Sequence, residues 1–76
     1  MTEMLEFLVK SLVEDPEAVE IEELEEDGNL VYEITVADDD LGRVIGKGGR
    51  VANAIRTIAK AAAVRIDRRV IVDILD

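Results

Sequence analysis

The chain has 76 residues, a hydrophobic fraction of 49% and a formal net charge of −9, a composition that suits one small folded domain. It contains no cysteine and no histidine, so disulfides and the usual transition-metal ligands are excluded, and we expect neither a metal nor a cofactor. No run approaches the roughly 20 apolar residues that a membrane helix needs. We therefore expect a cytoplasmic protein without a membrane segment.

The charge is divided unequally along the chain. Residues 1–42 hold fifteen acidic residues and one basic residue, a sum of −14, whereas residues 43–76 hold eight basic and three acidic residues, a sum of +5. Two interpretations stay open: solvated acidic strands beside a chance basic run, or a bipolar molecule whose basic end meets phosphate. Screening over roughly 8 Å at physiological salt makes local charge more important than net charge.

The N-terminal segment predicts an amphipathic helix. Apolar residues recur at helical spacing over residues 4–13, and Thr2 is the expected N-cap. Asp15-Pro16 ends the helix, because the residue before a proline is disfavoured in the helical conformation. Phe7, one of only two aromatic residues, occupies a core-like position in this pattern.

A β-hairpin is predicted next. Residues 19–26 and 30–37 alternate between apolar and polar side chains, as half-buried strands do. The Asp-Gly-Asn sequence at 27–29 is a strong turn signal. We expect the two strands to pair antiparallel with one face toward the core, and the second aromatic residue, Tyr32, to lie on that face.

The second half of the chain predicts two helices and a final strand. One aspartate of the run at 38–40 is expected to cap a short helix that continues through Ile45. A long amphipathic helix over residues 50–63 follows, with apolar residues at helical spacing. Residues 67–69 turn the chain, and the nearly all-apolar segment 70–75 predicts a strand that is covered over much of its surface.

A glycine-rich loop, Val-Ile-Gly-Lys-Gly-Gly-Arg at 44–50, separates these two helices. Gly46 and Gly49 lack a Cβ atom and can adopt positive φ, and the helix that follows offers its N–H groups to an anion. A P-loop is excluded because no serine or threonine follows Lys47. A dinucleotide fingerprint is excluded because the spacing that starts at Gly46 ends on Val51 instead of glycine or alanine.

Helix, Gly-x-x-Gly, helix resembles the KH domain, whose loop clamps the backbone of single-stranded RNA or DNA. The predicted order αββααβ resembles the type II KH fold, an α+β fold in which a three-stranded sheet packs on three helices. Over residues 1–76, as one domain, the chain resembles the small stand-alone bacterial KH proteins of the KhpA family. The resemblance rests on DLGRVIGKGGR at 40–50, AIRTI at 54–58, VDILD at 72–76, and Ala52, where many KH domains carry isoleucine.

The resemblance implies a groove for about four nucleotides of single-stranded RNA. Loop N–H groups would approach the sugar-phosphate backbone, and Lys47 and Arg50 would add charge for phosphates. Val44 and Ile45 would form an apolar floor for unstacked bases, and the strand around 34–36 would form the opposite wall. The expected RNA-binding residues are Arg43, Val44, Ile45, Gly46, Lys47, Gly48, Gly49 and Arg50.

Alternatives stay open for several of these residues and their neighbours. Val44 and Ile45 also fit a core position, and we expect at least one of them in the core. Arg56 and Lys60 fit phosphate contact and solvent exposure equally well. The basic residues around the last turn are interpreted as surface residues: Arg65, Arg68 and Arg69.

Weak binding by one domain favours pairing, because two linked grooves raise the apparent affinity. The resemblance implies RNA chaperone or post-transcriptional roles, as a homodimer or with a larger KH protein of the KhpB (Jag) type. The expected dimer surface is the helix at 50–63, where Ala54, Ala61 and Ala63 permit close approach. The competing interpretation is a protein-interaction adapter with little RNA affinity. An enzyme is not expected, because the loop has no nucleophile or base beside it.

Overall fold

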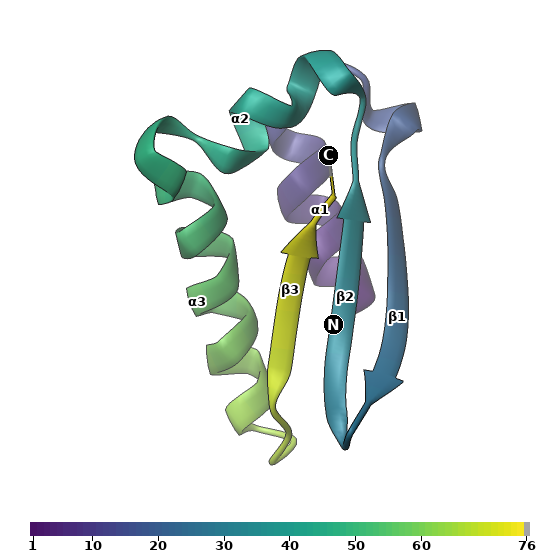
Figure 1. Ribbon diagram of the computed structural model, residues 1–76, viewed down its shortest axis with the longest axis vertical. Coiled ribbons are helices and arrows are strands. Elements are labelled where there is room, and N and C mark those ends of the chain that lie inside the picture. The colour runs from purple at the N-terminus through teal and green to yellow at the C-terminus, as the bar shows by residue number, and fades with distance from the viewer. Residues whose placement is uncertain (76) are drawn as a thin grey trace.

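The computed structural model describes residues 1–75 and contains, within them, three α-helices and three β-strands in the order expected for an αββααβ chain (Figure 1). The last residue of the VDILD segment, Asp76, lies outside the described residues. The helices are α1 (Thr2–Leu12), α2 (Leu41–Ile45) and α3 (Arg50–Val64), and the strands are β1 (Glu20–Glu26), β2 (Asn29–Thr35) and β3 (Val70–Ile74). Short 3-10 turns occupy Pro16–Ala18, Asp38–Asp40 and Lys47–Gly49.

The sheet has the strand order β1-β2-β3, so β2 is the central strand. β1 and β2 pair antiparallel, with Ile21 opposite Ile34, as the hairpin prediction requires. β2 and β3 pair parallel, with Ile34 also opposite Ile74. A parallel pair needs a crossover connection, and α2 and α3 supply it.

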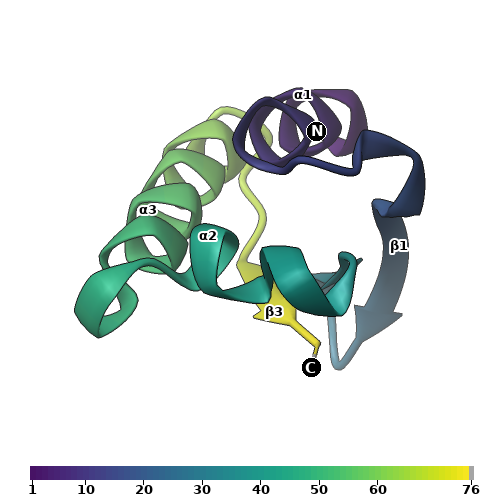
Figure 2. The ribbon, with the colours of Figure 1, turned by 90° about the horizontal axis from the view of Figure 1, so that it is seen from above.

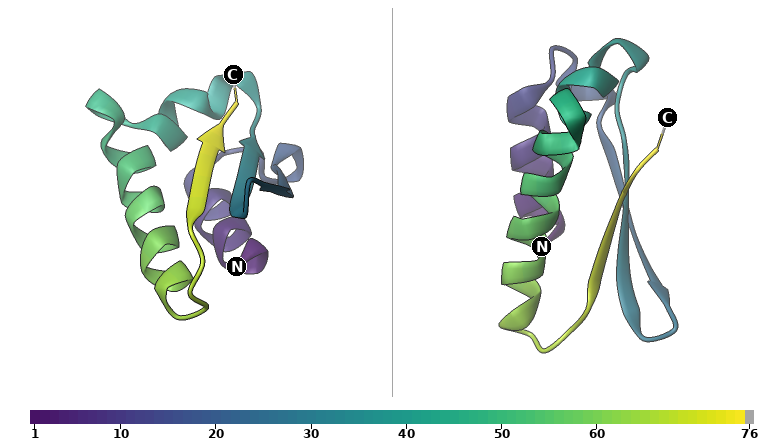
Figure 3. Two further views of the ribbon diagram at one scale, coloured as in Figure 1. Left: turned by 60° about the horizontal axis from the view of Figure 1, so that its bottom comes forward. Right: turned by 60° about the vertical axis from the view of Figure 1, so that its left-hand side comes forward.

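The helices α1 and α3 lie on one face of the sheet, and the other face has no helix over it (Figures 2 and 3). α2 crosses one end of this layer and leads into α3 (Figure 2). The core between the layers is aliphatic apart from Tyr32. It contains Leu5, Val9, Tyr32, Ile34, Val36, Val44, Ile55, Ala59, Ala63, Val70 and Val72.

The hairpin turn between β1 and β2 follows the prediction closely. Asp27 and Gly28 both have positive φ, 52° and 82°, which is the requirement of a two-residue type I′ turn. Tyr32 is buried, as expected, and its hydroxyl donates a 2.6 Å hydrogen bond to Oε1 of Glu23 on the neighbouring strand. Burial, with a further contribution from Glu23, raises the pKa of Tyr32 to about 12.

Two predictions about α1 were wrong. Met1, not Thr2, is the N-cap, and the Thr2 hydroxyl instead donates to Glu23 on β1 at 3.3 Å. Phe7 is 72% exposed. It follows the buried Leu5 by two residues, so it points about 200° away around the helix. The periodic pattern therefore located the helix but not the side on which the aromatic ring lies.

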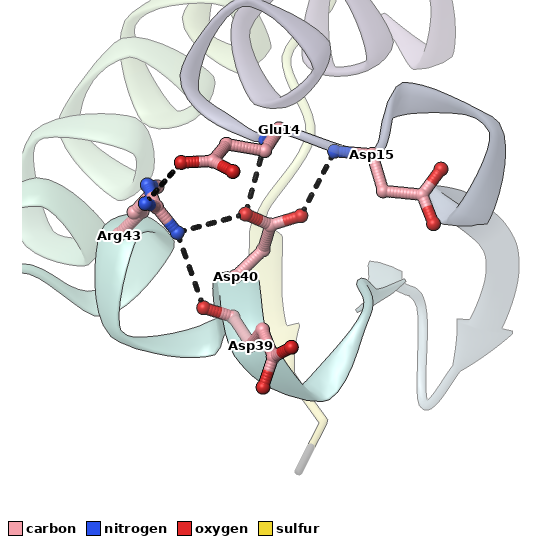
Figure 4. Close-up of polar contacts among 5 residues, drawn as sticks. All are labelled: Glu14, Asp15, Asp39, Asp40 and Arg43. Atoms are coloured by element: carbon pink, nitrogen blue, oxygen red, sulfur yellow. Dashed lines mark hydrogen bonds and ion pairs between the residues drawn. The ribbon is translucent and has the colours of Figure 1, made fainter.

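The aspartate run at 38–40 connects two helices through the side chain of its last residue, Asp40 (Figure 4). Asp40 is the N-cap residue of α2 by position, but its side chain makes no cap hydrogen bond, so the capping prediction holds in position only. Its buried carboxylate instead accepts hydrogen bonds from the backbone N–H groups of Glu14 (3.0 Å) and Asp15 (3.1 Å). These bonds join the end of α1 to the start of α2.

Arg43 completes this junction (Figure 4). Its guanidinium donates to the Asp40 carboxylate at 3.1 Å, to the backbone oxygen of Asp39 at 3.2 Å, and to the Glu14 carboxylate. The backbone hydrogen bond from Glu14, together with the N–H of Asp15 and the charge of Arg43, lowers the pKa of Asp40 below its ordinary value. The junction fixes α2, and with it the position from which the glycine loop begins.

Candidate functional site

The glycine loop is a tight turn that packs against the first turn of α3. Gly46 has φ 75° and ψ 171°, a conformation essentially restricted to glycine. A Cβ atom placed there would lie 2.4 Å from Cγ2 and 2.9 Å from the backbone nitrogen of Val51. Gly48 has φ 65°, but a Cβ atom placed there would meet open space. Gly46 is therefore required for packing, whereas Gly48 faces solvent.

The start of α3 is electropositive. Gly49 is the N-cap residue, has φ 79° and offers no side chain to the free N–H groups of the first turn. No acidic residue lies in that turn, and Lys47 and Arg50 on either side are both exposed. Because the helix dipole already places positive charge at this end, two cations beside it are favourable only when an anion is bound. The loop, Lys47 and Arg50 thus lie together at the N-terminal end of α3, and their contact with RNA stays a prediction.

The structure separates two other expected residues, Arg43 and Val44, from this cluster and leaves a third, Ile45, beside it. Arg43 is committed to the carboxylates of the α1–α2 junction. Val44 is 0% exposed, which confirms the alternative that at least one of the two apolar residues belongs to the core. Its side chain cannot form a floor on the surface of the free protein. Ile45 is 36% exposed and is the apolar residue of α2 that remains available beside the loop.

A groove lies between α3 and the outer edge of β3. A pocket of about 310 Å³ lies there, with Arg56 and Lys60 on its α3 side. Its other wall is β3, lined by Val70, Ile71, Val72 and Asp73. The prediction that residues 34–36 form this wall was wrong: β2 is paired on both sides, and Ile34 is completely buried.

The edge of β3 presents unpaired backbone groups to this groove. Arg69 O and Leu75 N both bond to β2, so the odd-numbered residues of β3 direct their backbone groups toward β2. In a parallel strand the intervening residues, Val70, Val72 and Ile74, direct theirs to the open side. Arg56 already uses one of these groups, because its Nε donates to Val72 O at 3.1 Å.

Arg56 and Lys60 are therefore the functional candidates that sequence reasoning left undecided. Both lie on the flank of α3 that faces β3, and both line the groove. Their spacing of four residues places them on one side of a helix and was the available signal. That signal could not show which strand the helix flank faces. Within residues 1–75 no cluster of side chains fit to hold a metal ion occurs.

The fold, the Gly-x-x-Gly loop and the adjoining groove together define a KH-type domain. A solved structure of Era from Aquifex aeolicus supports the fold, with a TM-score of 0.61 at 24% identity over 95% of this chain and 28% of that one. A family model described as the KhpA/KhpB KH domain matches residues 2–74. The chain belongs to this family, as the resemblance implied, and the family is a non-enzymatic class.

Full-length relatives agree with this assignment. A protein of Clostridium acetobutylicum named RNA-binding protein KhpA is 47% identical over 75 residues, covering 99% of this chain and 100% of the relative. A protein of the same name from Caldanaerobacter subterraneus is also 47% identical with the same coverage. In the part of the chain that the structure describes, no helix is long and apolar enough to cross a bilayer.

Proposed function

We propose that this protein binds single-stranded RNA in the groove between α3 and β3 and clamps the RNA backbone with the Gly-x-x-Gly loop. The observation that carries the proposal is the basic groove along the open edge of β3, lined by Arg56 and Lys60 of the same helix whose N-terminal end is electropositive. Loop N–H groups, Lys47 and Arg50 bind phosphate at one end. Arg56 and Lys60 bind phosphate further along.

The names of the relatives support the choice of RNA, and the shape of the groove supports a single strand. A duplex would present only its backbone, whereas an open strand edge can hydrogen-bond to the edges of unstacked bases. Ile45 on α2 and Ile71 on β3 are exposed apolar side chains and offer surface for the bases. No aromatic side chain lines the groove, so we expect low affinity from one domain, with strong salt dependence. Such binding fits a cytoplasmic role in RNA chaperone activity or post-transcriptional regulation.

We also propose that two domains pair through the outer surface of α3, either as a homodimer or with a KhpB-type partner. Ile58 is 42% exposed, and Ala54 and Ala61 are exposed beside it. Ala63, which we had expected on this surface, is buried in the core. Pairing would place two grooves in one particle and raise the apparent affinity. Light scattering that shows only monomers at micromolar concentration would contradict the homodimer.

The test of RNA binding is fluorescence anisotropy with a labelled ten-nucleotide RNA of mixed sequence, at low and at physiological salt. The variant Lys47→Asp, Gly48→Asp changes the loop charge by −3 and leaves the required Gly46 in place. Aspartate tolerates the left-handed conformation of position 48 better than most residues. We expect wild type to bind and the folded variant to lose binding.

A control variant with the same change in charge can be made elsewhere in the chain. Lys10→Asp with Ser11→Asp also changes the charge by −3, on exposed positions of α1 away from the groove. This variant should bind RNA nearly as well as wild type, because screening limits charge effects to about 8 Å at physiological salt. Circular dichroism checks that both variants fold. If both lose binding equally, overall charge and not the loop is responsible. If wild type does not bind, the protein-interaction adapter is the better interpretation.

A further inference from the structure

A second pocket, of about 360 Å³, lies at the end of the groove away from the glycine loop. It shares Lys60, Val70 and Ile71 with the first pocket, so the two form one continuous depression. Lys60 follows Arg50 by ten residues, about 15 Å along the helix at 1.5 Å per residue. A group bound here is therefore beyond the reach of the loop. The lining residues are Asn29, Lys60, Ala63, Arg68, Arg69, Val70 and Ile71.

The pocket is held by the turns on either side of it. Arg68 donates to the Glu25 carboxylate at 3.0 Å and to the backbone oxygen of Gly28 at 3.2 Å, so it joins the α3–β3 turn to the hairpin turn. Leu30 N donates to Arg69 O at 2.9 Å, directly beside Asn29. Asn29 is thus placed by a tight two-residue turn on one side and by the sheet on the other. The position of its backbone is therefore set by the fold.

The lining combines apolar walls with one neutral polar side chain. Ile71 is exposed and provides most of the aliphatic surface, to which the buried Ala63 and Val70 add only their edges. The Asn29 amide supplies a donor and an acceptor side by side. A phosphate alone would make no use of the aliphatic walls. A nucleobase would use both, because its faces are apolar and its edge carries donors and acceptors. On the edge that carries N6 and N7, adenine presents a donor beside an acceptor and pairs with an asparagine amide through two hydrogen bonds, whereas guanine presents two acceptors there.

We propose that this pocket binds an adenine base of the RNA strand and that Asn29 reads its edge. Lys60 and Arg69, at the rim, neutralise the phosphates on either side of the bound nucleotide. The pocket gives the protein a base preference that the glycine loop, which contacts only the backbone, cannot supply. The inference rests on the proposed RNA binding and adds the residue that determines specificity.

Anisotropy with a series of labelled RNAs tests this inference. The series consists of ten-nucleotide oligouridine and the same oligomer with one adenosine at each position in turn. We expect one or two positions to tighten wild-type binding by about tenfold, the lower range for a bidentate base contact. The measured ratio is the affinity for the preferred adenosine-containing oligomer divided by the affinity for oligouridine. Asn29→Ala should reduce this ratio to about one, and Asn29→Ser serves as a second variant. Asn53→Ala, the matched asparagine substitution at the other end of α3, should keep the ratio.

The chain also permits a direct measurement. It contains two asparagines, Asn29 and Asn53, and no glutamine, so an NMR spectrum of the protein shows two side-chain amide pairs. The Asn29 pair should shift when the adenosine-containing oligomer replaces oligouridine, and the Asn53 pair should not. Equal binding of all oligomers by wild type, or an unchanged ratio in Asn29→Ala, overturns the inference and leaves RNA binding intact. Failure to bind any oligomer of the series would overturn the proposed function, and the adenine pocket with it.

Discussion

The two edges of the sheet are both unpaired, but their surroundings carry opposite charge. β1 and β3 each leave one side of the backbone without a strand partner. Five of the seven residues of β1 are glutamates, and all five are exposed. β3 instead runs beside Arg56 and Lys60 of α3. Charged side chains on an edge strand prevent pairing with other strands, so the β1 edge is protected, whereas the β3 edge is open to a ligand of negative charge.

This difference shows how a chain with a net charge of −9 can present a surface for an anionic polymer. Strands in a sheet lie about 4.8 Å apart, so the two edges are separated by about 10 Å, which already exceeds the screening length. Each edge therefore acts with its local charge. If RNA binds as proposed, the acidic edge repels it from the rest of the surface and leaves the groove as the favourable site.

The largest effect is expected on the free energy of unfolding, from a substitution in the glycine loop before α3. Gly46→Ala should destabilise the fold by about 3 kcal/mol, the upper end for a forced backbone conformation, because the new Cβ also meets the backbone of Val51. Gly48→Ala, the matched substitution, should cost only about 1 kcal/mol, since its Cβ meets open space. Urea denaturation measures both. Equal losses would show that the loop does not pack on α3 as described.

A charge reversal on each edge compares the two directly. Arg56→Glu with Lys60→Glu should weaken RNA binding on the order of tenfold and reduce the slope of log affinity against log salt by about 1.4, because each phosphate contact to a single strand contributes about 0.7. Glu20→Lys with Glu22→Lys, on β1, should change affinity less than about threefold. Anisotropy over a range of salt concentrations gives both values. A larger effect on β1 would refute the assignment of the groove.

Local patterns were sufficient to predict most of the fold, and tertiary contacts explain what they missed. The hairpin depends on Asp27 and Gly28 and on period-two alternation, all local features, so it was predictable. Strand order is not local: nothing near Ile34 shows that β2 is central and therefore closed to ligand. Likewise the charge of Arg43 suggested a phosphate contact, but its partners are 3 and 29 residues away in the chain.

Asp40 shows that the acidic residues of the segment 1–42 do more than repel RNA, because this one stabilises the fold. Its pKa is lowered in the folded protein, so its contribution to stability is complete above its ordinary value near pH 4 and is lost as the pH falls through the lowered value. Asp40→Asn should lower the melting temperature at pH 7, and the difference from wild type should begin to shrink near pH 4 and disappear once the pH is below the lowered pKa of Asp40. Thermal denaturation against pH measures this. A difference that persists in acid would mean that shape, and not charge, holds the junction.

The smallest effect concerns Glu23, the one glutamate of β1 that bonds to the core. The chain has a single tyrosine, so ultraviolet absorbance against pH reports Tyr32 alone, with an expected midpoint near its pKa of about 12. Glu23→Gln removes the charge but leaves the burial, so the midpoint should fall and still exceed the ordinary value near 10. Because the raised pKa favours the neutral form, the stability from this contact is lost as the pH rises above about 10. A midpoint at the ordinary value in wild type would show that Tyr32 is solvated and that the acidic edge has no structural contact with the core.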